Sequence, residues 1–322
     1  MDQFAVDFAD IQSAAERIKN VAHRTPVMTC SVIDDIAGRQ LFFKCENFQK
    51  VGAFKFRGAF NAVQKLTAEE AARGVVTHSS GNHAQALALA ARMRGVPAHI
   101  VMPSTASPVK KVAVEGYGAN VIVCEPTLEA RETTAESVQR ETGATFIHPY
   151  DNADIIAGQG TAMLELYEQT QALGVSLNAV IAPVGGGGLL SGTAIAARSL
   201  DSSIRIFSAE PTGADDAAQS MAAGHWIAQE SPDTIADGLL TSTGKLTWPV
   251  IQNCVEQIVT VTDAEIVSAM RLLWERAKLL VEPSSAVVLA AILKPEFRAA
   301  DAVSTIGLIL SGGNVNLDKL PW

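Results

Sequence analysis

The segment AVIAPVGGGGLLSG, residues 179–192, runs from a short apolar stretch through four glycines into a stretch that can form a helix. An uninterrupted apolar run of this length suits a strand that is buried on both faces of a parallel sheet. Four consecutive glycines let the backbone direct its N–H groups toward one point, and a helix start adds positive partial charge. The segment therefore predicts an α/β fold with a phosphate-binding turn at the end of a strand. A flexible linker is disfavoured, because a linker would not sit tightly between a buried strand and a helix.

Two other kinds of phosphate site fit this segment less well. No Gly-Lys-Ser/Thr ending follows the glycines, so the segment is not the phosphate loop of nucleoside-triphosphate enzymes. The dinucleotide pattern nearly fits from Gly186 and Gly188 but has Ser191 in place of its third glycine. Glu210 is the one acidic residue near the end of a following strand, so a nicotinamide site is a weaker alternative.

Strand-like apolar runs alternate with helix-like stretches along nearly the whole chain, which is typical of βαβ units. We expect strands at residues 75–78, 98–102, 120–124, 145–148, 179–184, 204–210 and 306–310. Helices are expected at 82–94, up to about 117, up to about 141, and near Gly160–Gln171. The first four strands predict a small domain, residues 77–149, inserted into a large domain formed by residues 1–76 and 150–322.

The composition argues against a nucleic-acid or membrane partner. Of the 322 residues, 48% are hydrophobic and 18% are charged, and the formal net charge is −9. Phosphate-rich partners require a basic surface, so we expect no nucleic acid. Residues 1–7 show no signal-peptide pattern, and no apolar stretch reaches the roughly 18 residues of a membrane span. The four cysteines are scattered without a Cys-x-x-Cys pair, which favours free thiols and a cytoplasmic protein.

Lys55 is the residue with the clearest chemical potential. It lies between Phe54 and Phe56, just after a small-residue turn, in the stretch ENFQKVGAFKFRGA at 46–59. Burial disfavours the ammonium form and lowers the pKa of a lysine, and a free amine can attack an aldehyde. The alternative is a structural lysine with its stem on apolar neighbours and its head in water. From this stretch alone the structural alternative is favoured.

Two further loops place polar side chains at the ends of expected strands. SSGNH at 79–83 carries more hydroxyl, amide and imidazole groups than a helix cap requires, although an N-cap cluster is the alternative. SGGN at 311–314 follows the last buried strand, at the edge where open α/β sheets bind ligands. If both loops converge with Lys55 and the four glycines, they supply an amine nucleophile, a phosphate site and hydrogen-bonding groups. That combination points to pyridoxal phosphate.

These motifs, in this order, resemble fold-type II pyridoxal-phosphate enzymes, and in particular the serine/threonine dehydratase and serine racemase family. The likeness runs from TPV at 25–27 to SGGN at 311–314, which is nearly the whole chain. It implies two open, twisted, doubly wound parallel-sheet domains with the active site between them. It also implies that Lys55 binds the cofactor covalently and later removes the α-proton of the substrate.

The resemblance assigns further residues to the cofactor and the substrate. Asn82 would hydrogen-bond the ring oxygen of the cofactor, and Ser311 would face its pyridine nitrogen. A neutral hydroxyl stabilises a pyridinium less than an aspartate does, which favours prompt loss of a β-hydroxyl over a long-lived carbanion. The remaining cofactor residues implied are Phe54, Gly185, Gly186, Gly187, Gly188, Gly238 and Glu282. The substrate residues implied are Ser79, Ser80, Gly81, Asn82, His83 and Arg131.

Some positions distinguish branches within the family. Ser80 matches the serine that serine racemase-like members carry on the cofactor face opposite the lysine, where it could return a proton with inversion. EPTGADD at 210–216 resembles the divalent-cation loop of the same branch. There Glu210, Asp216 and the carbonyl of Ala214 would offer hard oxygen ligands to Mg²⁺, Ca²⁺ or Mn²⁺. Without the resemblance, a solvated acidic turn would be the preferred interpretation of this loop.

The chain also departs from its relatives. No regulatory domain follows Ser311, which argues against an isoleucine-inhibited threonine deaminase. Val51 and Cys30 stand where animal serine racemases have small hydroxyl residues, which weakens the expectation of activation by ATP. The family's other nucleotide-site residues are present, as Lys50, Gln85, Tyr117 and Asn314. HPYDN at 148–152 resembles microbial dehydratases more than animal racemases.

The expected activity is a β-elimination that converts a hydroxy amino acid to a 2-oxo acid and ammonia. Candidate substrates are L-threo-3-hydroxyaspartate, which the features above favour, L-serine and L-threonine. Arg131 could bind a second carboxylate, although a solvated helix arginine is an equally good interpretation. The alternatives are a serine racemase with elimination as a side activity and, more remotely, a β-replacement enzyme resembling the cysteine synthases. The resemblance also implies a homodimer.

Overall fold

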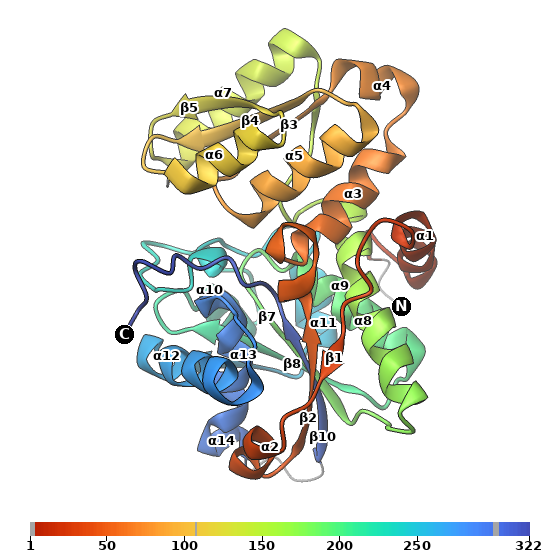
Figure 1. Ribbon diagram of the computed structural model, residues 1–322, viewed down its shortest axis with the longest axis vertical. Helices are drawn as coiled ribbons and strands as arrows, with labels where there is room; N and C mark the ends of the chain where they lie inside the picture. Colours follow the sequence, from red (N-terminus) through yellow and green to blue (C-terminus); the bar gives the residue numbers. More distant parts are fainter. Residues whose placement is uncertain (1–3, 107, 299–302) are drawn as a thin grey trace.

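Two lobes, each built around its own mainly parallel sheet, form the structure (Figure 1). The computed structural model describes residues 4–106, 108–298 and 303–322, so residues 1–3, 107 and 299–302 of the expected domains lie outside the description. The larger sheet has the order β1-β2-β10-β7-β8-β9, with bounds β1 Val27–Met28, β2 Gln40–Cys45, β7 Ala179–Pro183, β8 Arg205–Pro211, β9 Gln257–Val261 and β10 Thr305–Leu310. The smaller has the order β5-β4-β3-β6, with bounds β3 Val75–His78, β4 Ala98–Pro103, β5 Asn120–Cys124 and β6 Thr145–Phe146.

Helices cover both sheets. Those that accompany the smaller sheet in Figure 1 are α3 Lys55–Lys65, α4 Ala68–Arg73, α5 Asn82–Arg94, α6 Pro108–Gly116 and α7 Leu128–Thr142. The other α-helices are α1 Phe8–Ile18, α2 Ser31–Ala37, α8 Ala153–Ala172, α9 Gly188–Leu200, α10 Asp216–Ala223, α11 Trp248–Cys254, α12 Asp263–Leu272, α13 Pro283–Leu293 and α14 Pro295–Arg298. Short turns of other helix types are η1 Glu46–Phe48, η2 Lys50–Gly52, η3 Asp237–Leu239 and η4 Leu273–Ala277. No helix in these ranges is both long and apolar enough to cross a membrane.

The larger sheet is buried on both faces, as its apolar strands require. Successive residues of a strand point to opposite faces, so Phe43 and Ile181 pack into a core with α2, α12 and α13. Phe42 and Val180 belong to the core on the other face, with α8 and α9. This arrangement confirms the predicted α/β class.

The strand order brings the loops of interest to one edge of the larger sheet. β10 pairs in parallel with both β2 and β7, so all three strands end on the same side. β2 leads through η1 and η2 to Lys55, β10 leads to Ser311, and β7 leads to the four glycines. A bridge between Ala53 and Gly312 ties the first two of these loops together. Ligands of open α/β sheets bind at such an edge.

Most expected elements lie where the sequence predicts, and the end of one expected strand needs correction. The strand expected at 145–148 ends at Phe146, because only Thr145 and Phe146 pair with β3; the N–H of Ile147 makes a last bond to the carbonyl of Val76 before the chain bends at residues 149–150. The larger sheet is also not wholly parallel, since β1 runs antiparallel to β2. Antiparallel edge strands are common on otherwise parallel sheets.

The helix expected near Gly160–Gln171 starts seven residues earlier, at Ala153 of α8, so the expected start was wrong. The side chain of Asn152 caps this earlier start by accepting from the N–H groups of Asp154 and Ile155. Gly158 lies within α8 because only a glycine fits there: a Cβ would stand 2.5 Å from the Cα of Gly58 in α3. Glycine thus brings α8 into close contact with the helix that carries Lys55.

The boundary expected between residues 76 and 77 falls inside β3, which spans Val75–His78. Apolar residues of α3, including Phe56 and Phe60, also share one buried cluster with Leu87 of α5. The division of the chain into a domain of 77–149 and a domain of the remaining residues stays a prediction.

Candidate active site

Lys55 begins α3, and its amine lies among groups of both lobes. Its Nζ donates a hydrogen bond to the carbonyl of Pro149 at 2.9 Å and lies 5.1 Å from the centre of the Phe54 ring. Burial lowers the pKa of Lys55 to about 8, against a smaller opposing effect of the nearby Glu282 carboxyl. At pH 7 roughly one tenth of such an amine is uncharged, against roughly one part in three thousand at the ordinary pKa of 10.5. The environment therefore favours a nucleophilic lysine.

The glycine turn, defined as Gly185–Gly188, links β7 to the first residue of α9. Gly187 has a φ of +87°, a conformation that favours glycine. At Gly186 a Cβ would stand 2.2 Å from the ring of Tyr150, so that ring lies directly against the turn. Within the described chain, the N–H groups of the four glycines donate to no protein acceptor. Four free amides at a helix start fit a phosphate group.

Thr247 holds the glycine turn by a hydrogen bond, and the sequence pattern does not predict this contact. Its buried hydroxyl donates to the carbonyl of Gly186 at 2.8 Å and accepts from the N–H of Gly244 at 2.7 Å. Asp151 holds the same loop through the N–H groups of Lys245 and Leu246. Thr247 and Asp151 lie 61 and 34 residues from Gly186 and Gly185, so only the folded chain brings them together.

Asn82, Glu282 and Ser311 meet around the end of β10. The Asn82 amide donates to Glu282 at 2.9 Å and accepts from the side chain of Asn314 at 2.8 Å. The backbone N–H of Asn314 donates to the other Glu282 oxygen. Burial is the main cause that raises the pKa of Glu282 to about 8. Ser311 is buried, and its carbonyl accepts from the N–H of Phe54 beside Lys55.

Gly238 also lies beside the glycine turn. Its N–H donates to the hydroxyl of Ser284 at 2.9 Å. The following residue, Leu239, lies so close that a Cβ on Gly185 would stand 2.9 Å from its Cα. The structure thus brings together, at one edge, the loops expected to contact a cofactor.

The segment 79–83 forms the turn after β3 and the first two residues of α5. Ser79 accepts from the N–H of Gly81 at 3.3 Å, and Ser80 is half-buried. His83 is buried, with Nε2 at 3.2 Å from the carbonyl of Ile147, and its Nδ1 has no partner among the described residues. Since that carbonyl needs a donor, the proton of the neutral ring belongs on Nε2. The His83 side chain is buried in the protein interior, and the contact of residues 79–83 with a substrate stays a prediction.

Arg131 lies in the first turn of α7, where its Nε donates to the carbonyl of Thr127, the residue before the helix, at 3.4 Å. It is close enough to His78 to contribute to the lowering of that residue's pKa, although burial is the larger cause. No hydrogen bond in the described ranges joins Arg131 to Lys55 or Ser80. Its role with a substrate stays a prediction.

Glu210, near the end of β8, lies against the start of α10, whose first residue is Asp216. The Glu210 carboxylate accepts from the N–H groups of Ala217 and Ala218, and Asp216 Oδ2 accepts from the N–H of Thr243. Asp216 Oδ1 is buried without a partner, and burial raises the pKa of both carboxyl groups, to about 9 and about 6. An unpaired buried carboxylate oxygen fits a cation. A cluster of three or more acidic, histidine or cysteine ligands does not occur among the described residues.

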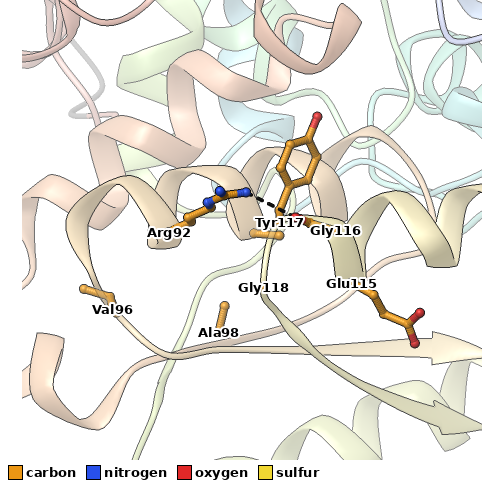
Figure 2. Close-up of a pocket in the computed structure, with 8 residues that line it drawn as sticks. Arg92, Val96, Ala98, Glu115, Gly116, Tyr117 and Gly118 are labelled. Atoms are coloured by element: carbon orange, nitrogen blue, oxygen red, sulfur yellow. Dashed lines mark hydrogen bonds between the residues drawn. The ribbon is translucent and has the colours of Figure 1, made fainter.

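A separate surface cavity of about 350 Å³ lies in the smaller lobe (Figure 2). Its lining includes Arg92 of α5, which donates to the Gly116 carbonyl, and Tyr117. It shares no lining residue with the Lys55 site.

Comparison with known proteins decides the family. The model for pyridoxal-phosphate dependent enzymes matches residues 18–312. The chain belongs to this family. It is 51% identical over 318 residues to the serine racemase of Dictyostelium discoideum, covering 98% of this chain and 97% of that protein. It is also 51% identical over 316 residues to the β-hydroxyaspartate dehydratase of Paracoccus denitrificans, covering 98% of each. The structure of maize serine racemase matches with a TM-score of 0.95 and 50% identity, over 98% of this chain and 95% of that chain.

These similarities confirm the fold-type II expectation and the enzyme class. The protein is a pyridoxal-phosphate enzyme whose relatives include racemases and dehydratases of hydroxy amino acids. The roles of Lys55, Ser80 and the glycine turn in this protein are proposals.

Proposed function

We propose that the protein is an ammonia-lyase that eliminates water from a hydroxy amino acid and releases a 2-oxo acid and ammonia. The observation that carries this proposal is the buried amine of Lys55 beside the glycine turn, whose N–H groups have no protein acceptor among the described residues. We place the phosphate of the cofactor at that turn and the covalent bond to the cofactor at Lys55 Nζ. When bound, pyridoxal phosphate supplies an electron sink for the pair left when the α-proton is removed.

Lys55 acts in this proposal as the base that takes the α-proton. Its pKa of about 8 suits proton transfer near neutral pH, because an efficient general base has a pKa near the operating pH. Its hydrogen bond to the Pro149 carbonyl holds the amine at the junction of the two lobes. Loss of the β-hydroxyl then leaves an enamine, which water converts to the 2-oxo acid and ammonia.

L-threo-3-hydroxyaspartate is the substrate that we favour, with L-serine and L-threonine as alternatives. The similarity to the β-hydroxyaspartate dehydratase of P. denitrificans supports this choice. Arg131 is the cation that we propose for the second carboxylate. A serine racemase is the second candidate function, and the half-buried Ser80 in the turn before α5 favours it, since a hydroxyl opposite Lys55 could return the proton with inversion.

A divalent cation at Glu210, Ala214 and Asp216 completes the proposal. The unpaired Asp216 Oδ1 and the carbonyl of Ala214 are hard oxygen donors of the kind that Mg²⁺, Ca²⁺ and Mn²⁺ prefer. We also propose that the protein is a cytoplasmic homodimer, as the composition and the family resemblance suggest.

A substrate panel tests the activity. The purified protein, with and without Mg²⁺, is incubated with each of the three candidates, and ammonia, 2-oxo acid and D-serine are measured. The proposal expects ammonia and 2-oxo acid in equal amounts, fastest from hydroxyaspartate. Formation of D-serine with little ammonia would favour the racemase, and no product from any candidate would refute both.

A further inference from the structure

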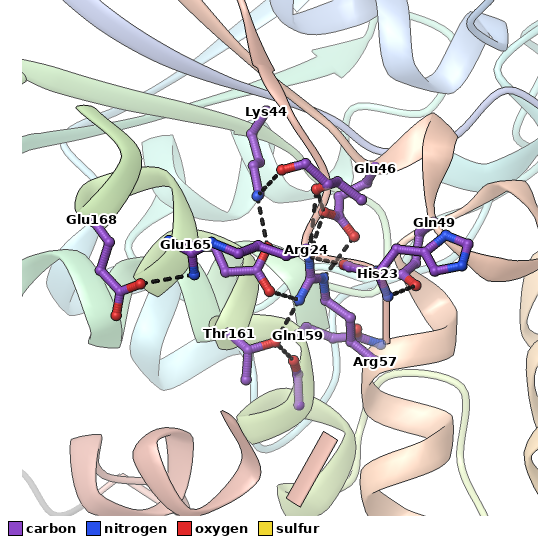
Figure 3. A network of polar contacts seen from close by, with 12 residues as sticks. His23, Arg24, Lys44, Glu46, Gln49, Arg57, Gln159, Thr161, Glu165 and Glu168 are labelled. Carbon is purple, nitrogen blue, oxygen red and sulfur yellow. Dashed lines mark hydrogen bonds and ion pairs between the residues drawn. The ribbon is translucent and has the colours of Figure 1, made fainter. Parts of the chain in front are cut away.

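A cluster of buried charges lies where α3, η1, α8 and β2 meet (Figure 3). We define the charge cluster as Lys44, Glu46, Arg57 and Glu165. The side chains of the first three have no exposed surface, and that of Glu165 is 17% exposed. Two cations face two anions, so the charge cluster is neutral as a whole.

Arg57 connects three separate elements through this cluster. Its Nε and Nη2 donate to the Glu46 carboxylate of η1 at 2.7 and 2.8 Å. Its Nη1 and Nη2 donate to the Glu165 carboxylate of α8, each at 2.8 Å. A planar guanidinium that binds two carboxylates in this way has little freedom to rotate or shift. The first turn of α3 is thereby fixed relative to η1 and α8.

Stability alone does not account for such a cluster. Removing four charged groups from water is costly, and well-packed apolar residues can often replace buried ion pairs without loss of stability. What the planar guanidinium adds to packing is a set of directional, bidentate hydrogen bonds that fix its orientation. The geometry fixed here is that of the turn that starts with Lys55.

Arg57 follows Lys55 by two residues, which is a rotation of about 200° around a helix. The two side chains therefore leave α3 on opposite sides, Lys55 toward Pro149 and Arg57 toward the charge cluster. A rotation of the first turn about the helix axis would therefore both break the hydrogen bonds of Arg57 and displace Lys55 Nζ.

Contacts further along the turn agree with this arrangement. The carbonyl of Phe54 accepts from the N–H of Arg57, and the N–H of Gly58 donates instead to the side chain of Gln159 in α8 at 3.2 Å. The backbone of Gly58 also touches Gly158. Phe54, the residue before α3, makes no side-chain cap. The start of α3 is therefore held by α8 and η1 and not by a cap of its own.

We infer that, given the role proposed above for Lys55, Arg57 is a positioning residue that sets the rotation of α3 and hence the place of the reacting amine. Arg57 does not touch the reacting atoms. It acts on Lys55 through the first turn of the helix.

Lys44 provides a matched control, because it belongs to the same cluster but lies on β2. Its Nζ donates to Glu165 and Gln169. Arg57→Met and Lys44→Met each remove one buried cation and leave the same residual charge. Of these two variants, only Arg57→Met removes the bonds that join α3 to η1 and α8. Arg57→Lys keeps the charge but loses the planar fork.

The experiment compares the three variants with the wild type as cofactor-loaded enzymes, by unfolding, kinetics and the visible band of the bound cofactor. Both methionine variants should lose stability. Arg57→Met and Arg57→Lys should lower kcat by about 10- to 100-fold, as misplacement of a reacting group by about 1 Å does. They should also shift the pH midpoint of the visible band, while Lys44→Met keeps the wild-type kcat and midpoint.

Two results would overturn the inference: an unchanged kcat and midpoint in the Arg57 variants, or equal losses in Lys44→Met. If Arg57→Met does not fold, Arg57→Lys and Glu46→Gln, which removes one carboxylate without a change in size, allow the same comparison. Failure of borohydride to attach the cofactor to Lys55 in the wild type would instead refute the proposed function.

Discussion

Thr247→Val tests whether the glycine turn needs its hydrogen bond from the Thr247 hydroxyl to bind the cofactor. Valine has nearly the shape of threonine but lacks the hydroxyl that donates to the Gly186 carbonyl and accepts from the Gly244 N–H. Both backbone groups lose this partner in a buried place. The Gly186 carbonyl shares a rigid peptide plane with the N–H of Gly187. If this peptide plane rotates so that the Gly186 carbonyl bonds another donor, the N–H of Gly187 also turns away from the proposed phosphate position.

The magnitude follows from the two groups left unpaired. Each buried polar group that loses its partner costs about 1–3 kcal/mol, so the free energy of unfolding should fall by about 2 kcal/mol or more. If the apoprotein recovers part of this free energy by turning the peptide plane, cofactor binding must reverse that turn. Each 1.4 kcal/mol recovered in this way weakens cofactor binding about tenfold. We therefore expect the dissociation constant of pyridoxal phosphate to rise by at least about tenfold.

The assay pairs denaturant unfolding of the apoprotein with an absorbance titration of the cofactor. Ser208→Ala is the control, because its buried hydroxyl also donates to a backbone carbonyl, that of Ala182, at 2.8 Å, but within the sheet. It should lose stability while its cofactor affinity stays near the wild-type value. If Thr247→Val is destabilised to the same extent and binds the cofactor as tightly as the wild type, Thr247 does not shape the turn.

Three other predictions concern single residues. Folding raises the pKa of Glu282 from 4.5 to about 8, so the stability that this group contributes is complete below pH 4.5 and is lost as the pH rises through 8. Glu282→Gln should therefore flatten the pH–stability curve of the apoprotein between these two values. An unchanged slope would contradict the raised pKa of Glu282. Mg²⁺ should raise the Tm of the wild type but not of Asp216→Asn, and an equal rise in both would place the cation elsewhere. Ser80→Ala should abolish any racemisation of serine while sparing elimination from L-substrates, whereas equal loss of both activities would exclude an opposite-face role.

The sequence was informative where chemistry depends on local pattern. Apolar runs followed by Gly or Ser clusters predicted β7 with its glycine turn and β10 with its loop, because strand and turn preferences act over a few residues. Parallel strands end at the same edge, so convergence of the loops could also be anticipated. The family resemblance supplied the roles that pattern alone left open.

Contacts between distant segments could not be anticipated in this way. Arg57 and Glu165 lie 108 residues apart, and nothing in either local stretch indicates that they pair. Gly158 suggests a helix break by its low helix propensity, yet its role is the close contact of α8 with Gly58. Such features depend on the packing of whole helices.

Reduction with borohydride followed by peptide mapping tests the central claim most directly. The purified protein should carry a visible absorption band that borohydride bleaches, and the reduced cofactor should be found on the peptide that contains Lys55. Lys55→Ala should show no such band and no labelled peptide. A colourless wild-type protein that fails to bind pyridoxal phosphate, or a label on another lysine, would contradict the account.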